Sequence, residues 1–143
     1  IDGNYSDNRR PDSVTFTRSL EEDLKRRDFT INAMAYNDEV GLVDPFNGME
    51  DIEYNKIRCV GRPEDRFAED ALRILRAIRF ASQLEFVIEP GTDWNISKMC
   101  KNLENISIER INSEFCKIAQ KNSVYKWFYT MMYSHYLFLK SKI

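Results

Sequence analysis

The chain has 143 residues, of which 43% are hydrophobic and 31% are charged, with 5 glycines and 4 prolines. This composition is that of a globular protein of about one domain, and it excludes collagen, low-complexity tracts and wholesale disorder. Because 23 acidic residues slightly outnumber 21 basic ones, there is no overall cationic field, and a nucleic-acid partner must be indicated by local clusters.

The cysteines Cys59, Cys100 and Cys116 are widely spaced and odd in number, which argues against a disulfide framework and against a zinc site. Reduced thiols are typical of the cytosol. No stretch reaches the roughly 18 consecutive apolar residues of a membrane span, and the N-terminal residues lack the pattern of a signal peptide. We therefore expect a cytoplasmic protein with no membrane partner. Since the first residue, Ile1, is not Met, we also expect that upstream sequence is missing.

The first part of the chain is expected to mix short strands with a helix. A capping-box sequence at Ser19 to Glu22 predicts a helix that runs into Lys25–Arg27. Gly41 supplies the permissive backbone that a turn between two strands needs. Alternating or apolar segments bounded by turn residues predict the strands, which lie at residues 13–17, 33–36, 42–44 and 56–60.

The second part of the chain is expected to be helical, with no strand from Phe67 onward. Apolar periodicity and the breaks between periodic segments define the helices, which lie at about 66–84, 91–104, 108–121 and 123–139. The pattern predicts an α+β fold in which a mixed part precedes an all-helical part, with the boundary near residues 50–62.

The most informative stretch runs from Glu69 to Ala81. As one helix it gathers an apolar face, made of Phe67, Ala71, Ile74, Leu75, Ile78 and Ala81. Charged residues recur every three positions on the other side, at Asp70, Arg73, Arg76 and Arg79. One interpretation is a solvated face with internal ion pairs. The apolar residues Leu72, Phe80 and Leu84 in the same arc favour a second one, contact with an anionic ligand that carries a polar ring.

A second charged cluster joins Lys25–Arg27 to Asp28 and Asn32. One interpretation is a helix C-terminus whose cations satisfy its own dipole. The other is a nucleotide contact, in which the arginines bind phosphate while Asp28 and Asn32 hold sugar hydroxyls.

Four segments resemble, in the right order, the successive motifs of the class II tRNA nucleotidyltransferases. These are the CCA-adding enzymes, which share a superfamily with bacterial poly(A) polymerases. The four segments are residues 26–34, 44–48, 69–76 and 109–114. The resemblance implies the end of a nucleotidyltransferase head at 1–55, followed by a helical neck at 56–143 that holds the incoming nucleotide and continues toward the body. Residues 44–48 match the hinge between head and neck.

Matching positions also imply roles for single residues. Those implied to bind the nucleotide are Arg27, Asp28, Asp70, Arg73, Arg76 and Arg79, with Asp28 on the ribose side. Those implied to brace the pocket without touching substrate are Glu109, Arg110 and Glu114.

The implied base preference agrees with the chemistry of Asp70 and Arg73. Cytosine and adenine both present an amine donor beside a ring-nitrogen acceptor, whereas guanine and uracil present the opposite order. A carboxylate next to a guanidinium, as the two residues would be one helical turn apart, accepts from the amine and donates to the ring nitrogen. A mismatched base leaves charged groups unpaired at a cost of about 1 to 3 kcal/mol each. We therefore expect CTP and ATP as substrates and the tRNA 3′ end as partner.

The family also carries an Asp-x-Asp pair that binds two Mg²⁺ ions for phosphoryl transfer. This sequence has no Asp-x-Asp after a Gly-rich strand. We expect the Mg²⁺ ligands upstream, no catalytic residue within this chain, and no activity of the chain alone. Two alternatives stay open: a poly(A) polymerase or an adder of only CC or only A from the same family, and a catalytically inactive RNA-binding or structural module.

Overall fold

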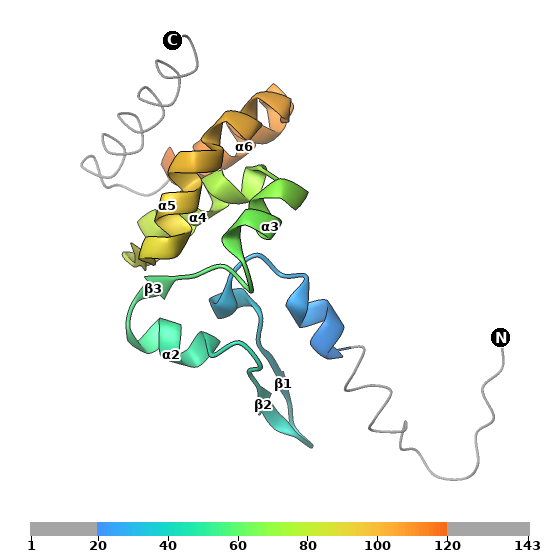
Figure 1. Ribbon diagram of the computed structural model, residues 1–143. Helices are drawn as coiled ribbons and strands as arrows, with labels where there is room; N and C mark the ends of the chain where they lie inside the picture. Colours follow the sequence, from blue (N-terminus) through green and yellow to red (C-terminus); the bar gives the residue numbers. More distant parts are fainter. Residues whose placement is uncertain (1–19, 120–143) are drawn as a thin grey trace, which may run out of the picture.

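The computed structural model describes residues 20–119 (Figure 1). A helix occupies residues 20–25, and the later elements are η1 (Thr30–Asn32), β1 (Ala35–Asn37), β2 (Gly41–Val43), α2 (Gly48–Glu53), β3 (Lys56–Ile57), α3 (Pro63–Glu69), α4 (Leu72–Leu84), β4 (Val87–Ile88), α5 (Pro90–Met99), η2 (Cys100–Asn105) and α6 (Ile108–Ala119). The predicted α+β class is confirmed. The strand expected at 13–17 and the helix expected at 123–139 lie outside the described residues.

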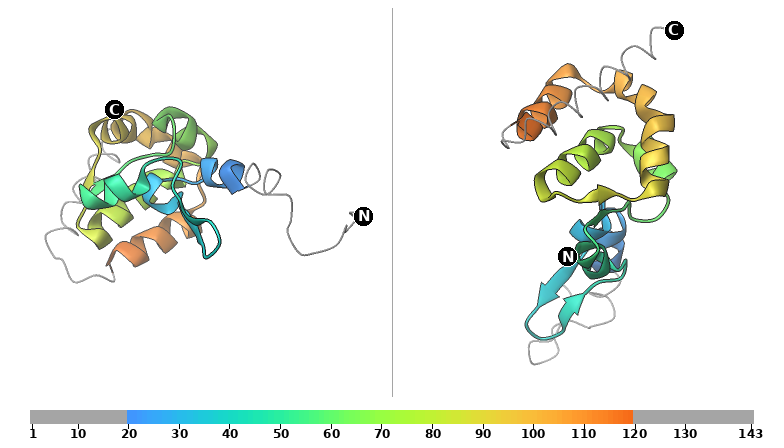
Figure 2. Two further views of the ribbon diagram at one scale, coloured as in Figure 1. Left: turned by 90° about the horizontal axis from the view of Figure 1, so that it is seen from below. Right: turned by 90° about the vertical axis from the view of Figure 1, so that its left-hand side faces the viewer.

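The first two strands form the expected hairpin. They pair antiparallel, with Tyr36 opposite Leu42. The Asn37 side chain accepts a hydrogen bond from the Glu39 N–H at 2.7 Å, and Gly41 has a φ of +82°. An Asx turn and a residue in the left-handed region therefore reverse the chain. The hairpin projects at the end of the molecule away from α6 (Figures 1 and 2).

The expectation of no strand after Phe67 is wrong. The strand β4 follows α4 and pairs in parallel with β3, placing Val87 beside Lys56 and Ile88 beside Ile57. The strand β3 lies within the strand predicted at 56–60, whereas β4 has only two residues and is too short for an alternating pattern to be visible in the sequence. Their pairing depends on tertiary contact, so local residue patterns could not predict it.

The single helix expected at 66–84 is also wrong, because α3 and α4 are separate helices. Asp70 between them is extended, with φ −151° and ψ 104°. Its carboxylate accepts a hydrogen bond from the N–H of Leu72 at 3.0 Å, which satisfies a free donor at the start of α4. Asp70 and Arg73 therefore do not lie one turn apart on one helix. The break contains neither Gly nor Pro, and the apolar periodicity continues across it.

The helix α2 was not predicted, since residues 45–48 read only as the end of the hairpin. The Asp44 carboxylate accepts from the N–H groups of Gly48 and Met49, at 2.7 and 2.9 Å. These are the donors that a helix N-terminus leaves free. A Cβ atom at Gly48 would lie 2.3 Å from the carbonyl oxygen of Thr30, so this helix is packed directly against η1.

One buried core connects the early and late parts of the chain. It is made of Phe29, Ile57, Cys59, Phe67, Ile74, Ala77 and Ile96. The apolar face predicted for 67–81 thus supplies part of the core. A second cluster, of Leu24, Ala33 and Val60, lies beneath the helix at 20–25. No helix within residues 20–119 has the length and apolar character needed to cross a membrane.

Candidate functional site

The side chain of Asp28 joins the early part of the chain to α4. It is 7% exposed and lies 2.7 Å from the Nε atom of Arg76. The other carboxylate oxygen accepts from the N–H of Phe29 at 2.9 Å and from the Asn32 carboxamide at 3.4 Å. Both oxygens therefore have protein partners, and Asp28 anchors the 26–34 segment to α4. Its predicted contact with a ribose stays a prediction.

The cationic segment that precedes Asp28 is held through its backbone. The carbonyl of Lys25 accepts from Arg66 at 3.1 Å, and the carbonyl of Arg26 accepts from Arg73 at 3.2 Å. Two arginines thus bind the carbonyl end of the helix at 20–25, where cations are favourable. The side chain of Arg27 is 53% exposed, and its one ion pair among residues 20–119 is with Asp23, which is also exposed. It remains accessible to an anionic ligand.

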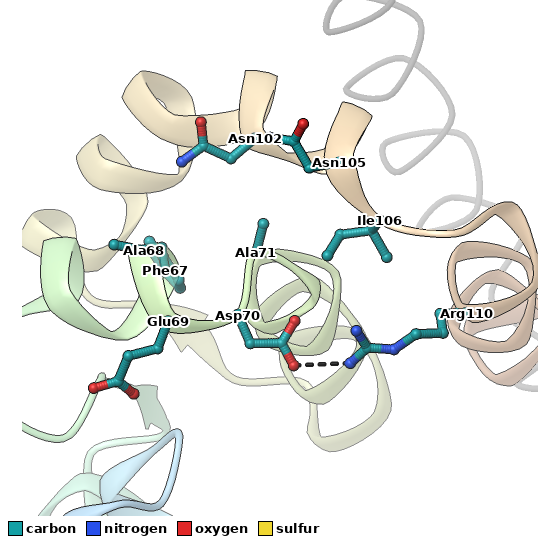
Figure 3. Close-up of a pocket in the computed structure, with 9 residues that line it drawn as sticks. All are labelled: Phe67, Ala68, Glu69, Asp70, Ala71, Asn102, Asn105, Ile106 and Arg110. Atoms are coloured by element: carbon teal, nitrogen blue, oxygen red, sulfur yellow. Dashed lines mark hydrogen bonds and ion pairs between the residues drawn. The ribbon is translucent and has the colours of Figure 1, made fainter.

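The side chains of Asp70 and Arg73 point to different partners. Asp70 is 2.8 Å from the guanidinium of Arg110 on α6, whereas Arg73 is 2.7 Å from Glu69. Figure 3 shows Asp70 facing Arg110 while Glu69 extends the other way. The break between α3 and α4 thus divides two groups that the sequence pattern placed on one row.

The remaining member of the row, Arg79, is buried between α4 and α6. Its Nε atom lies 2.7 Å from Glu114, which is only 4% exposed and also binds Lys117. The guanidinium lies 4.4 Å from the ring centroid of Phe80, a cation–π distance. Arg79 and Glu114 therefore connect two helices, and the predicted nucleotide contact of Arg79 stays a prediction.

A pocket of about 480 Å³ opens beside the α3–α4 break (Figure 3). Asp70 and Arg110 line it together with Asn102 and Asn105 of η2. Arg110 was predicted to brace the nucleotide site, whereas Glu109 is exposed and does not line this pocket. The two asparagines were not singled out from the sequence, because no motif or periodic pattern marks them.

The Cys59 thiol is chemically inert. Burial raises the pKa of Cys59 to about 12, although a hydrogen bond with the Thr92 side chain acts in the opposite direction. The thiol is therefore protonated at neutral pH and is no nucleophile. Within residues 20–119, no group of three or more His, Cys, Asp or Glu side chains is placed to hold a metal ion.

Two family models match the chain. One, described as the poly A polymerase head domain, matches residues 1–58. The other, described as a probable RNA and SrmB-binding site of polymerase A, matches residues 85–138. Among curated relatives, the CCA-adding enzyme of Enterococcus faecalis is 56% identical over 114 residues, covering 80% of this chain and 28% of the relative. That of Limosilactobacillus fermentum is 50% identical over 135 residues, covering 92% and 34%.

Solved structures give the same picture. The Bacillus stearothermophilus CCA-adding enzyme in complex with CTP is 49% identical, with a TM-score of 0.68 over 69% of this chain and 25% of its own. The Thermotoga maritima CCA-adding enzyme complexed with tRNA is 35% identical, with a TM-score of 0.72 over 79% and 28%. The chain therefore spans about a third or less of the proteins it resembles.

Proposed function

Because this chain belongs to the family of tRNA nucleotidyltransferases that contains the CCA-adding enzymes, we propose that the full-length protein adds C and A to the 3′ end of tRNA. The nucleotides come from CTP and ATP, and no template is used. Relatives that are 50% and 56% identical support CCA addition, and solved relatives with bound CTP, ATP and tRNA support these substrates. Residues 85–138 are assigned to RNA contact on their match to an RNA-binding model.

The observation that carries the proposal is the match to CCA-adding enzymes over 80% and 92% of this chain; Asp70 and Arg73, which the resemblance implies for base reading, lie at the α3–α4 break with separate partners. The Asp70 side chain is 31% exposed, and the oxygen that Arg110 binds retains a lone pair for an exocyclic amine. Arg73 donates to Glu69 and to the carbonyls of Arg66 and Arg26, and its five N–H groups leave donors beyond these three. We assign base reading to these two residues. When the nucleotide binds, its base replaces Glu69 as a partner of the Arg73 guanidinium.

The cationic segment next to Arg73 suits the phosphates. Arg27 is exposed and its pair with Asp23 is a solvent-exposed one, worth about 0 to 1 kcal/mol. A triphosphate replaces such a partner at little cost, because it offers several charge-assisted hydrogen bonds. Asp28 and Arg76 place this segment beside α4, so we assign them to the nucleotide site through the backbone they fix.

Arg110 and Glu114 are assigned to bracing. Arg110 fixes one oxygen of Asp70 while Leu72 fixes the other, at 2.8 and 3.0 Å. Glu114 holds Arg79 and so connects α6 to α4. A carboxylate that reads a base is more selective when its own position is fixed, because a mobile carboxylate can adjust to the pairing edge of the wrong base. Glu109 belongs to the same segment and keeps the role that the resemblance implies.

The Mg²⁺ of the proposed reaction would supply Lewis-acid chemistry at the transferring phosphate. Residues 20–119 contain no group of carboxylates placed to hold it. The residues named above therefore bind and position the nucleotide and do not hold the metal.

The experiment is incorporation by the full-length protein onto tRNA transcripts that lack their last three nucleotides. Reactions contain each of the four nucleotides singly and then CTP with ATP, and the products are sequenced. The proposal expects CCA as the terminal product. Long A tracts would instead identify a poly(A) polymerase, and termination after CC or a single A would identify a partial adder. No incorporation with any RNA would favour the inactive binding module.

A further inference from the structure

The carboxylate of Glu69 bridges two arginines across the α3–α4 break. One oxygen lies 2.6 Å from the guanidinium of Arg66, three residues earlier on α3. The other oxygen lies 2.7 Å from the guanidinium of Arg73, in the first turn of α4. Figure 3 shows that the Glu69 side chain extends away from Asp70. Because the proposed base reading takes Arg73 away from Glu69, the partner that this carboxylate keeps affects nucleotide binding.

Arg73 does not depend on Glu69 for its position. The Nη1 atom that binds Glu69 also donates to the carbonyl of Arg66 at 3.3 Å, and the Nη2 atom donates to the carbonyl of Arg26 at 3.2 Å. Both acceptors belong to the backbone, and the Arg73 side chain is only 18% exposed. When the base displaces Glu69, the hydrogen bonds to these two carbonyls therefore still hold the guanidinium at the nucleotide site.

Glu69, in contrast, depends on Arg66 once Arg73 has turned to the base. Within residues 20–119 its ion pairs are those with these two arginines. The Arg66 side chain is 16% exposed and also donates to the carbonyl of Lys25 at 3.1 Å, so it stays beside Glu69. The Glu69 side chain is 48% exposed, so water can replace Arg73 on the other oxygen. A carboxylate that keeps one cation remains compensated, whereas a carboxylate with none would compete with the base for Arg73.

We propose that Arg66 is a positioning residue for the incoming nucleotide, and that it holds Glu69 while the base takes the place of Glu69 on Arg73. The proposal rests on the proposed function, because it takes a nucleotide base as the new partner of Arg73. Arg66 lowers the cost of the exchange, since two cations on one carboxylate repel each other and the second therefore adds less than the first. The exchange is the same for CTP and ATP, so Arg66 affects the binding of both and leaves base selection to Asp70 and Arg73.

The test is nucleotide binding by full-length variants, measured by titration calorimetry with CTP and with ATP in the absence of RNA. In Arg66→Ala the Kd for both nucleotides is expected to rise roughly tenfold, the effect of losing a hydrogen-bonded partner of a charged group. Arg66→Lys keeps a cation beside Glu69 and is expected to restore most of the affinity. Arg62→Ala is the matched control, because this arginine is 76% exposed at the start of α3, and it is expected to change neither Kd.

The neutral variant Glu69→Gln shows whether Arg66 acts through Glu69. Without the negative charge there is no carboxylate to compensate, so adding Arg66→Ala to Glu69→Gln is expected to change both Kd values by less than about twofold. Unchanged Kd values in Arg66→Ala alone would overturn the proposal. So would a full rise of about tenfold in the Glu69→Gln background, because Arg66 would then act only by supporting the fold.

The same titrations separate this proposal from the proposed function. Wild-type protein that binds both nucleotides but adds none to RNA contradicts the proposed function alone, and the Kd values of the variants then still decide the role of Arg66. Wild-type protein that binds neither nucleotide contradicts both.

Discussion

At the scale of single residues, the Asp28–Arg76 pair is the clearest link between the 26–34 segment and α4. Replacing Asp28 by Asn leaves the Arg76 guanidinium without its charged partner, 2.7 Å away. We expect the free energy of unfolding of the full-length protein to fall by about 1 to 3 kcal/mol, because Asp28 is buried while Arg76 is a third exposed and partly screened. Asp23→Asn is the control, because its pair with Arg27 is exposed and is worth about 0 to 1 kcal/mol.

Urea unfolding of both variants measures the difference. Equal losses from Asp28→Asn and Asp23→Asn would show that Asp28 is not a structural anchor, and would return it to the sugar-contacting role implied by the resemblance.

Thiol chemistry provides a second test at this scale. Because burial raises the pKa of Cys59 to about 12, only about one thousandth of this thiol is ionised at pH 9. Cys116 is exposed on α6. We expect iodoacetamide at pH 8 to alkylate Cys116 in the native protein and to leave Cys59 unmodified until urea is added. Peptide mapping by mass spectrometry gives the result, and rapid native labelling of Cys59 would mean that this part of the core opens.

The residue types of the site could be predicted, but their partners could not. The spacing of Asp70, Arg73, Arg76 and Arg79 marked them as a group. Their contacts with three different parts of the chain, α3, α6 and residues 26–28, depend on tertiary structure and on an extended Asp70, which no local pattern encodes. Asn102 and Asn105 carried no sequence signal at all.

At the scale of elements, the packing of α2 on η1 depends on Gly48. An added Cβ would lie 2.3 Å from the Thr30 carbonyl oxygen and 2.8 Å from the Met34 sulfur. Backbone cannot yield as a side chain does, so we expect Gly48→Ala to lower the unfolding free energy by about 2 to 3 kcal/mol. Gly61→Ala is the matched control, since its Cβ meets nothing within 4 Å and only the φ of +68° is strained, at about 1 kcal/mol. A smaller loss at Gly48 than at Gly61 would contradict this packing.

The start of α5 makes stability depend on pH. Burial opposes ionisation of Glu89, but hydrogen bonds from Gly91 and Thr92 outweigh it, so its pKa lies below the ordinary value of 4.5. A lowered pKa stabilises the fold above pH 4.5, and that contribution disappears as the pH falls through the folded-state pKa.

The variant Glu89→Ala tests this helix cap. We expect it to cost about 1 kcal/mol at pH 7, with a smaller difference from the wild type below pH 4. Glu104→Ala, on an exposed position, is expected to change the unfolding free energy little at either pH. A loss at Glu89 that is independent of pH would exclude the ionised carboxylate as the cap.

Elements with local signals could be predicted, and those without them could not. The hairpin has Asn37 and Gly41 at its turn, and α6 has a clear apolar stripe. The strand β4 is two residues long and pairs with β3 only by tertiary contact, so no local pattern predicted it. The break between α3 and α4 is stabilised by the carboxylate of Asp70. Because the apolar periodicity of a helix continues across this residue, the sequence pattern did not reveal the break.

At the scale of the whole molecule, the two parts expected from the sequence share one core. Phe29, Ile57 and Cys59 pack in the same cluster as Phe67, Ile74 and Ile96. The boundary expected between residues 55 and 56 falls immediately before β3, and backbone contacts cross it, among them the hydrogen bond from the Val87 N–H to the Asn55 carbonyl at 2.8 Å and the bridge between Phe29 and Cys59. The division into head and neck stays a prediction. The shared core fixes the position of the cationic segment at 25–27 relative to the α3–α4 break.

The central claim is that Asp70 and Arg73 read the base of the incoming nucleotide. The most direct measurement is single-nucleotide incorporation by full-length Asp70→Ala onto tRNA lacking its end, with each of the four nucleotides and with Asp65→Ala as control, since Asp65 is exposed on α3. Arg73 alone can donate to the carbonyls of uracil and guanine, so discrimination against UTP and GTP is predicted to fall by about 1 to 3 kcal/mol, a factor of roughly ten to a hundred. An Asp70→Ala enzyme that is slower but keeps full preference for C and A would contradict the claim.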